Sequence, residues 1–195
     1  LLSGDVAFKD LGLLIIDEEH RFGVLQKEKL KKIKEGVDAI SMTATPIPRS
    51  LQMSLSGIRD ISVIYTPPPA RQAIRTIISY FNDEIVRDAI VLEKMRGGQT
   101  FFIHNEIHNI ERIADYIKRI VPEAKVAIAH GKLETRQIER VMIAFIKKEI
   151  DVLISTTIIA SGVDIPTANT IIVENAHKFG LTDLYQLKGR VGRSK

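Results

Sequence analysis

The stretch LGLLIIDEEHRFG, residues 11–23, decides the fold. Its apolar residues 13–16 form a short run that is typical of a strand buried in a parallel sheet. Three acidic residues and a histidine follow directly: Asp17, Glu18, Glu19 and His20. In an open α/β sheet, ligands bind beyond the carboxyl ends of the strands. The stretch therefore predicts a strand that delivers carboxylates to a ligand site. The alternative is that these acids only stabilise the N-terminus of the next helix.

Length and composition indicate a globular protein and exclude several classes. The chain has 195 residues, 45% hydrophobic and 27% charged, with a net charge of +4 that permits nucleic acid as a partner. No apolar run approaches the roughly 20 residues of a membrane helix, and no signal peptide pattern occurs. The absence of cysteine excludes disulfides and thiolate-bound zinc. We expect a cytoplasmic protein without membrane contact and, because the first residue is leucine, a piece of a longer chain.

Short apolar segments alternate with helical patterns along most of the chain. Helices are predicted where apolar residues recur every three or four positions, and Asn82-Asp83 is a good N-cap for one of them, which Gly97-Gly98 ends. The alternation predicts an α/β fold with helices on the faces of parallel sheets, whose strands are apolar on both faces. The predicted strands are residues 13–16, 39–42, 61–65, 76–81, 100–103, 126–129, 152–155 and 170–173.

A proline-rich stretch, YTPPPARQ at residues 65–72, predicts the domain boundary. We expect a first domain at residues 1–66, a linker at 67–73 and a second domain at 74–195. The first domain offers too few strands to bury both faces of a parallel sheet. Its uncovered apolar edges and faces are expected to be mobile, to dock on the second domain or to pair with another copy of the chain.

Three further motifs place polar residues after predicted strands. SMTATPIPR carries Thr43 and Thr45, whereas STTIIASGVDIP carries Thr156 and Thr157 and then Gly162 and Asp164. QLKGRVGRS carries Gln186 and two arginines, Arg190 and Arg193, whose spacing predicts one face of a helix and a clamp for a triphosphate. Each motif alone also fits a turn or a solvated helix. Together, in this order, they favour a nucleotide site.

These motifs resemble motifs II, III, V and VI of superfamily 2 helicases and translocases. The runs DEEHRFGV, TATPIPR, IPTANTIIVENAHKFGL and QLKGRVGRS are similar to those of the RecG/Mfd branch. DEEH and the serine after the last Gly-Arg favour the Mfd family, with a RecG-like helicase for branched DNA as the alternative. The resemblance implies RecA-like lobes of the P-loop NTPase type, the first partial and the second nearly complete. ATP would bind between the lobes, and double-stranded DNA would lie across their outer face.

The resemblance also implies a role for each matching residue. Asp17 would hold Mg²⁺ with ATP and Glu18 would activate water. His20, Thr43 and Thr45 would couple the ATP site to DNA. Other ATP contacts would come from Glu19, Gly162, Asp164 and Gln186, with Arg190 and Arg193 as catalytic arginines at the γ-phosphate. DNA contacts would come from Thr156, Thr157, His130 and Gly131. The implied partners of the longer protein are duplex DNA, a stalled RNA polymerase that it displaces, and excision-repair proteins.

The sequence departs from this pattern in several places. No P-loop run, G-x-x-x-x-G-K-[ST], occurs in it, so we predict that this chain alone neither binds ATP tightly nor hydrolyses it and carries no bound cofactor. Ala160 stands where relatives usually carry an acid. A non-catalytic DNA-binding or protein-binding module is therefore an alternative. The run HNEIH, residues 104–108, does not fit the metalloprotease zinc pattern.

Overall fold

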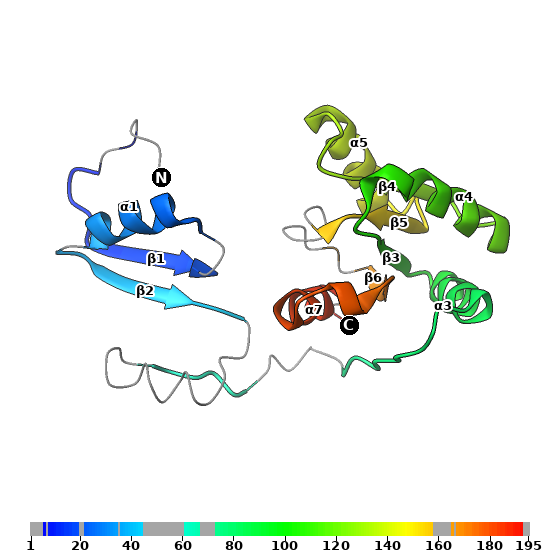
Figure 1. The fold of residues 1–195 in the computed structure, drawn as a ribbon, viewed down its shortest axis with the longest axis horizontal. Coiled ribbons are helices and arrows are strands. Elements are labelled where there is room, and N and C mark those ends of the chain that lie inside the picture. The colour runs from blue at the N-terminus through cyan, green and yellow to red at the C-terminus, as the bar shows by residue number, and fades with distance from the viewer. Residues whose placement is uncertain are drawn as a thin grey trace. The chain divides into compact units, whose positions relative to one another are not determined.

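The computed structural model describes residues 6, 8–19, 22–34, 36–44, 61–66, 73–157, 165 and 167–192. The chain divides into two compact units, Leu1–Ile61 and Ser62–Lys195. Each unit is built on parallel strands with helices beside them (Figure 1). Within the described ranges, every helix is too short or too polar to cross a membrane. The expected linker at residues 67–73 lies almost wholly outside the described residues, so it stays a prediction.

The first unit contains a strand, a helix and a second strand. Strand β1 (Leu13–Asp17) pairs in parallel with β2 (Asp38–Met42), and Asp17 lies opposite Met42. Helix α1 (Val24–Lys34) connects the two strands. This connection places the carboxyl ends of both strands at one edge, as the sequence predicts for a βαβ unit.

Only one face of this strand pair is covered among the described residues. Helix α1 contributes Leu30 to a small core, which also contains Leu14 and Ile16. In the described part of this unit a single helix covers a two-stranded sheet, as expected of a domain with too few strands to bury both faces. The expected uncovered apolar face is confirmed, since four of its side chains are about half exposed: Leu13, Ile15, Ile40 and Met42.

The second unit contains a four-stranded parallel sheet in the order β4-β5-β3-β6. The strands are β3 (Gln99–Ile103), β4 (Val126–Ala129), β5 (Val152–Ser155) and β6 (Ala168–Val173). The helices are α3 (Asp83–Met95), α4 (Ile110–Ile120), α5 (Thr135–Ile146) and α7 (Leu181–Lys188), with short 3₁₀ turns η2 (Ile107–Asn109) and η3 (Ala176–Lys178).

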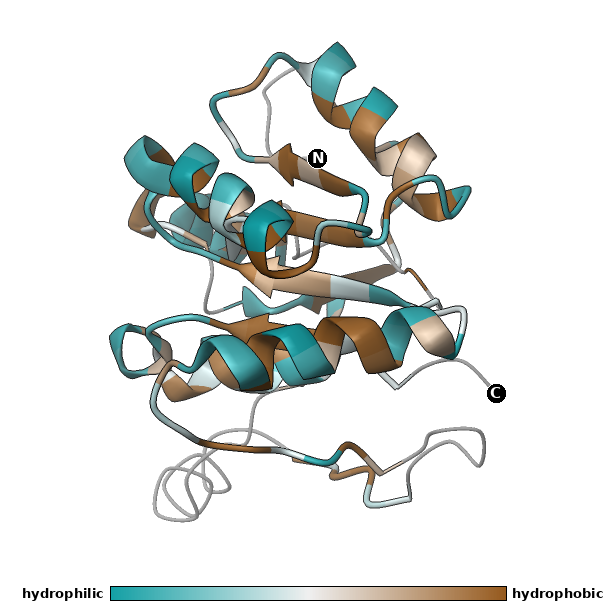
Figure 2. Ribbon diagram, turned by 90° about the vertical axis from the view of Figure 1, so that its right-hand side faces the viewer, coloured by the Kyte–Doolittle hydropathy of each residue, from teal (hydrophilic) through white to brown (hydrophobic). Residues whose placement is uncertain are grey.

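Helices cover both faces of this sheet, and successive strand residues alternate between two cores. Phe102 packs with residues of α3 and α4, whereas its neighbour Phe101 packs with residues of α5 and α7. The second core includes Phe145, whose ring meets that of Phe101 edge to face at a centroid distance of 5.2 Å. In Figure 2 the strands are largely brown, and the helices alternate between brown and teal. Burial on both faces explains why these strand sequences are mostly apolar.

Two predicted strands do not form. Residues 61–65 and 76–81 have irregular backbone and pair with no strand among the described residues. Their composition favours strands, but a strand also requires a hydrogen-bonded neighbour. Several of their apolar side chains are instead nearly fully exposed: Ile64, Tyr65, Ile78 and Tyr80.

Helix α3 begins and ends where the sequence predicts. The side chain of Asn82 accepts a hydrogen bond from the backbone N–H of Glu84 at 2.7 Å. After the helix, Gly97 has a φ of +71°, in the left-handed region that favours glycine. Gly98 then approaches the side chain of Glu93 so closely that a Cβ atom would lie 1.7 Å from Oε1.

Replacing Gly98 by alanine should destabilise the second unit. Glu93 is 2% exposed, and its Oε2 accepts a hydrogen bond from Thr170 Oγ1 at 2.6 Å, so it cannot move aside without losing a buried contact. We expect Gly98→Ala to lower the free energy of unfolding by about 1–3 kcal/mol, measured by urea denaturation. In the control Gly180→Ala, the added Cβ would meet only the Asp183 carboxylate at 3.2 Å, and stability should hardly change. Equal stability of both variants would contradict the prediction.

Candidate functional site

The acidic motif of the first unit lies at the carboxyl end of β1. Asp17 is the last residue of the strand and is exposed. Glu18 continues the ladder, since its N–H donates to the Met42 carbonyl at 2.9 Å. The φ of Glu18 is +51°, a left-handed conformation that is uncommon for residues other than glycine. Such conformations cluster at functional sites.

The Glu18 carboxylate joins the ends of the two strands. One oxygen accepts a hydrogen bond from Thr43 Oγ1 at 3.2 Å, and the other accepts one from the Ala44 N–H at 3.0 Å. The structure thus brings together Glu18 and Thr43, two predicted site residues that are 25 positions apart. A carboxylate fixed on two donors, at an exposed strand end, is suited to orient a water molecule and take its proton.

Glu19 has different partners. Its carboxylate accepts a hydrogen bond from Ser41 Oγ at 2.6 Å and pairs with Lys34 Nζ at 3.3 Å. Glu19 thereby connects β1 to β2 and to the last turn of α1. The predicted contact of Glu19 with ATP has no support in this geometry and stays a prediction. His20 and Thr45 lie outside the described residues.

The residues present fit a magnesium ion of the kind that accompanies a nucleotide. Mg²⁺ takes one or two carboxylates and completes its shell with phosphate oxygens and water. Asp17 supplies one exposed carboxylate at the strand end. In the part of the chain that the structure describes, no three acidic, histidine or cysteine side chains cluster as an all-protein metal site would require.

In the second unit, predicted DNA-contact residues meet at the carboxyl edge of the sheet. Ala129 lies opposite Ser155 in the β4–β5 pair, so His130 and Thr156 follow neighbouring strands. Gly131 is exposed in the turn after β4, and Thr157 is partly buried. The hydroxyls of Ser155 and Thr156 are buried and have no hydrogen-bond partner among the described residues. Buried unpaired hydroxyls at a strand end suit a functional site.

The predicted arginine helix is corrected by the structure. Helix α7 ends at Lys188, and Arg190 lies in the turn that follows, with its N–H donating to the Leu187 carbonyl at 3.0 Å. Gly192 has a φ of +73°, which is incompatible with continued helix. Gln186 lies on α7 and is partly buried. Gly162, Asp164 and Arg193 lie outside the described residues.

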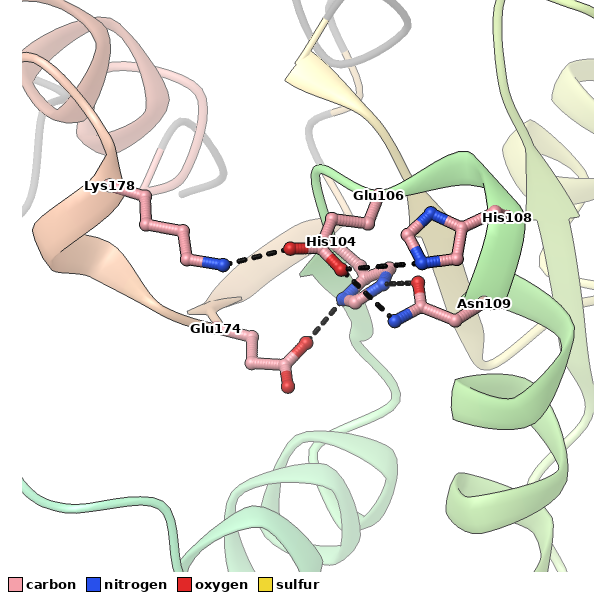
Figure 3. A network of polar contacts seen from close by, with 6 residues as sticks. All are labelled: His104, Glu106, His108, Asn109, Glu174 and Lys178. Carbon is pink, nitrogen blue, oxygen red and sulfur yellow. Dashed lines mark hydrogen bonds and ion pairs between the residues drawn. The ribbon is translucent and has the colours of Figure 1, made fainter.

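A polar network at the same edge of the sheet was not predicted from the sequence. His104, which is 2% exposed, follows β3, and its two ring nitrogens hydrogen-bond with the Glu174 carboxylate and the Asn109 side chain (Figure 3). Asn109 Nδ2 also donates to Glu106 at 3.2 Å. The available signal was positional: Glu174 follows a predicted strand, just as His104 does, and parallel strands end at one edge.

An exposed ion pair closes this network. Lys178 Nζ lies 2.8 Å from the Glu106 carboxylate. The hydrogen bond and the charge of Lys178 lower the pKa of Glu106, and the same contact raises the pKa of Lys178. The loop at residues 104–109 is therefore tied to the turn that follows β6.

Comparisons with known proteins agree with these motifs. Residues 82–195 match the family described as helicase conserved C-terminal domain. The whole chain is 58% identical to a transcription-repair-coupling factor of Bacillus subtilis (strain 168) and 53% identical to one of Escherichia coli (strain K12). It spans 16% and 17% of the length of these relatives.

Solved structures also resemble the chain. A structure of RecG bound to a three-way DNA junction has a TM-score of 0.70 and 39% identity, covering 99% of this chain and 26% of that chain. Dbp5 of S. cerevisiae, bound to RNA and ADP BeF3, has a TM-score of 0.62 at 18% identity, covering 93% of this chain and 50% of that chain. The similarity to Dbp5 concerns the fold alone.

Proposed function

Because the chain belongs to the family of helicase conserved C-terminal domains, we propose that it is the motor segment of an ATP-dependent translocase on double-stranded DNA. The observation that carries this proposal is the Glu18 carboxylate, held between Thr43 and Ala44 at the carboxyl ends of two parallel strands. In the complete motor, ATP would bind at this edge, where Asp17 would hold Mg²⁺. The metal would neutralise charge on the phosphates during transfer.

The proposed roles follow from the positions of the side chains. Glu18 orients the attacking water and accepts its proton. The same carboxylate contacts Thr43, so a change at the γ-phosphate alters a hydrogen bond to the segment after β2. His20 and Thr45 are proposed to extend this coupling. Arg190, Arg193 and Gln186 are proposed to stabilise the γ-phosphate, with Glu19, Gly162 and Asp164 as further ATP contacts.

DNA is proposed to lie along the carboxyl edge of the second unit. His130 and Gly131 after β4, and Thr156 and Thr157 after β5, offer side chains and backbone N–H groups for phosphate oxygens. Contacts of this kind position a duplex without reading its sequence, which suits a protein that moves along DNA.

The longer protein is proposed to act in transcription-coupled DNA repair. The identity of 58% and 53% with transcription-repair-coupling factors supports this assignment over RecG, at 39%. The proposed partners of the longer protein are therefore a stalled RNA polymerase and excision-repair proteins. A RecG-like action on branched DNA is the second candidate, favoured by the TM-score of 0.70 over nearly the whole chain.

A reciprocal transplant tests the assignment. This chain would replace the matching segment in the Bacillus subtilis factor and, separately, in RecG. We expect the first chimera to release stalled RNA polymerase from DNA with ATP, and the second to fail in unwinding a three-way junction. Activity of the RecG chimera alone would assign the segment to a branched-DNA helicase, and inactivity of both would favour a non-catalytic module.

The isolated chain should not hydrolyse ATP. It contains no P-loop, whose backbone and lysine hold the β- and γ-phosphates in this class of enzyme. We expect phosphate release at the background rate, with and without duplex DNA, in a coupled assay with the first chimera as the positive control. DNA-stimulated hydrolysis by the isolated chain would contradict this prediction.

A further inference from the structure

The second unit contains a cavity of about 740 Å³ that has no role in the proposed function. It lies beside α4, between the residue that precedes the cap of α3 and the turn after β6. Its size is within the usual range of ligand sites, about 300–1,000 Å³. Six of its lining residues carry the argument: Phe81, Asn109, Arg112, Tyr116, Arg119 and Glu174.

One wall of the cavity is a fixed aromatic pair. The rings of Phe81 and Tyr116 lie 5.6 Å apart between centroids, tilted by 46°. The Tyr116 hydroxyl donates to Asp83 Oδ1 at 2.8 Å, which fixes the ring. Burial, and then this hydrogen bond, raise the pKa of Tyr116, so the phenol is neutral at physiological pH. This wall is apolar, preorganised and suited to an apolar side chain.

Two guanidinium groups flank this wall. Arg112 and Arg119 are two turns apart on α4, about 10 Å along the helix axis. Arg119 lies over the Tyr116 ring at 5.7 Å from its centroid. Both arginines are exposed, and neither pairs with a carboxylate in the part of the chain that is described. They are therefore available to carboxylates of a partner.

The acidic groups of the cavity have partners of their own. Glu174 hydrogen-bonds with His104, and Asp115 lies 3.7 Å from Lys118. Arg112 and Arg119 are thus the charged side chains of the lining without an ion-pair or hydrogen-bond partner among the described residues. Asn109 and Glu174 also hold His104, so a molecule bound here would contact the network that fixes the loop at residues 104–109 (Figure 3).

We propose that this cavity binds an acidic segment of a partner protein. Its carboxylates pair with Arg112 and Arg119, and one apolar side chain lies against Phe81 and Tyr116. Tyrosine, phenylalanine and arginine are the residues enriched in protein interfaces. A nucleic-acid backbone fits less well, because the carboxylates of Asp115 and Glu174 would repel a continuous row of phosphates. A peptide can present neutral groups to them.

A direct binding measurement with the whole chain tests the proposal. The probe is a fluorescein-labelled peptide of alternating glutamate and leucine with one central phenylalanine, followed by fluorescence anisotropy. We expect saturable binding that Arg112→Glu and Arg119→Glu each weaken by about tenfold or more, because interface arginines often dominate affinity. The matched control is Arg136→Glu on α5, an exposed cation outside the cavity lining, which should leave affinity within about threefold. The three replaced cations are exposed, so each variant should fold, which circular dichroism verifies.

Several results would overturn the proposal. One is no binding, and another is an equal loss in Arg136→Glu, which would indicate unspecific charge attraction. Labelled DNA that binds more tightly than the peptide, and loses affinity in Arg112→Glu, would make the cavity a nucleic-acid site. A dimer in sedimentation velocity that Arg112→Glu dissociates would make the occupant a second copy of this chain. None of these results depends on ATP hydrolysis. The experiment can therefore contradict the peptide-binding proposal without contradicting the proposed motor function, and the reverse also holds.

Discussion

Replacing Glu18 by glutamine in the Bacillus subtilis chimera should lower the kcat of ATP hydrolysis by about 10²–10⁴. Glutamine keeps the shape of the side chain: its oxygen can still accept from the Ala44 N–H, and its NH2 group can donate to Thr43 Oγ1. It cannot take a proton from water. The KM for ATP should therefore change little, and the measurement is steady-state phosphate release with saturating duplex DNA.

The neighbouring acid provides the matched control. Glu19 is engaged by Lys34 and Ser41 and is proposed as an ATP contact rather than as the base, so Glu19→Gln should raise the KM for ATP and leave kcat within about tenfold. Comparing the two variants distinguishes the effect of losing any negative charge at the strand end from the effect of losing the residue that accepts the proton. If Glu18→Gln keeps normal turnover, or if both variants lose it equally, Glu18 is not the residue that activates water.

The left-handed backbone of Glu18 explains why its exact partners were not predicted from the sequence. The run of apolar residues identified β1 and its acidic end, since a buried strand followed by three acids is visible in the sequence. The acid that turns toward β2 is determined by the φ of +51° at Glu18, and no local sequence pattern predicts this backbone conformation. The resemblance assigned Glu18 a role, and the geometry adds its contacts with Thr43 and Ala44.

The second unit was the more predictable of the two. Its strands at residues 126–129 and 152–155 have the predicted bounds, and the RecA-like α/β fold agrees with the family and structural matches. β5 is buried throughout and β4 is partly buried, and both sequences are almost wholly apolar. Residues 76–81 have a similar composition but no strand beside them among the described residues. Composition indicates the tendency of a segment to form a strand, but whether it pairs with another strand depends on the rest of the fold.

Strand order limited the prediction of the polar network. His104 and Glu174 are 70 residues apart, and they meet because β6 pairs with β3 rather than with β5, which precedes it in the chain. The sequence shows that both residues follow strands, but it does not show which strands are neighbours. The prediction that both arginines lie on one helix was wrong for a different reason. Gly189 directly precedes Arg190 and Gly192 directly precedes Arg193, and these glycines indicate that the helix ends before the arginines.

Replacing Arg193 by alanine in the same chimera should lower kcat by about 10³–10⁵, the usual effect of an arginine finger in phosphoryl transfer. The guanidinium group is proposed to stabilise charge that develops on the γ-phosphate oxygens, so KM should change less than kcat. Arg190→Ala should give a loss of the same kind, and Arg190→Lys should not restore turnover, because an ammonium group cannot form two parallel hydrogen bonds. Lys188→Ala, an exposed cation at the end of α7, is the control.

Combining Arg193→Ala with Glu18→Gln tests whether the two residues act in one chemical step. Groups that act as a unit are not additive, so the double variant should be about as slow as the slower single variant. Single-turnover hydrolysis with excess enzyme measures this step without product release. A product of the two single losses would mean that Glu18 and Arg193 act independently, and normal turnover in the double variant would exclude both from catalysis.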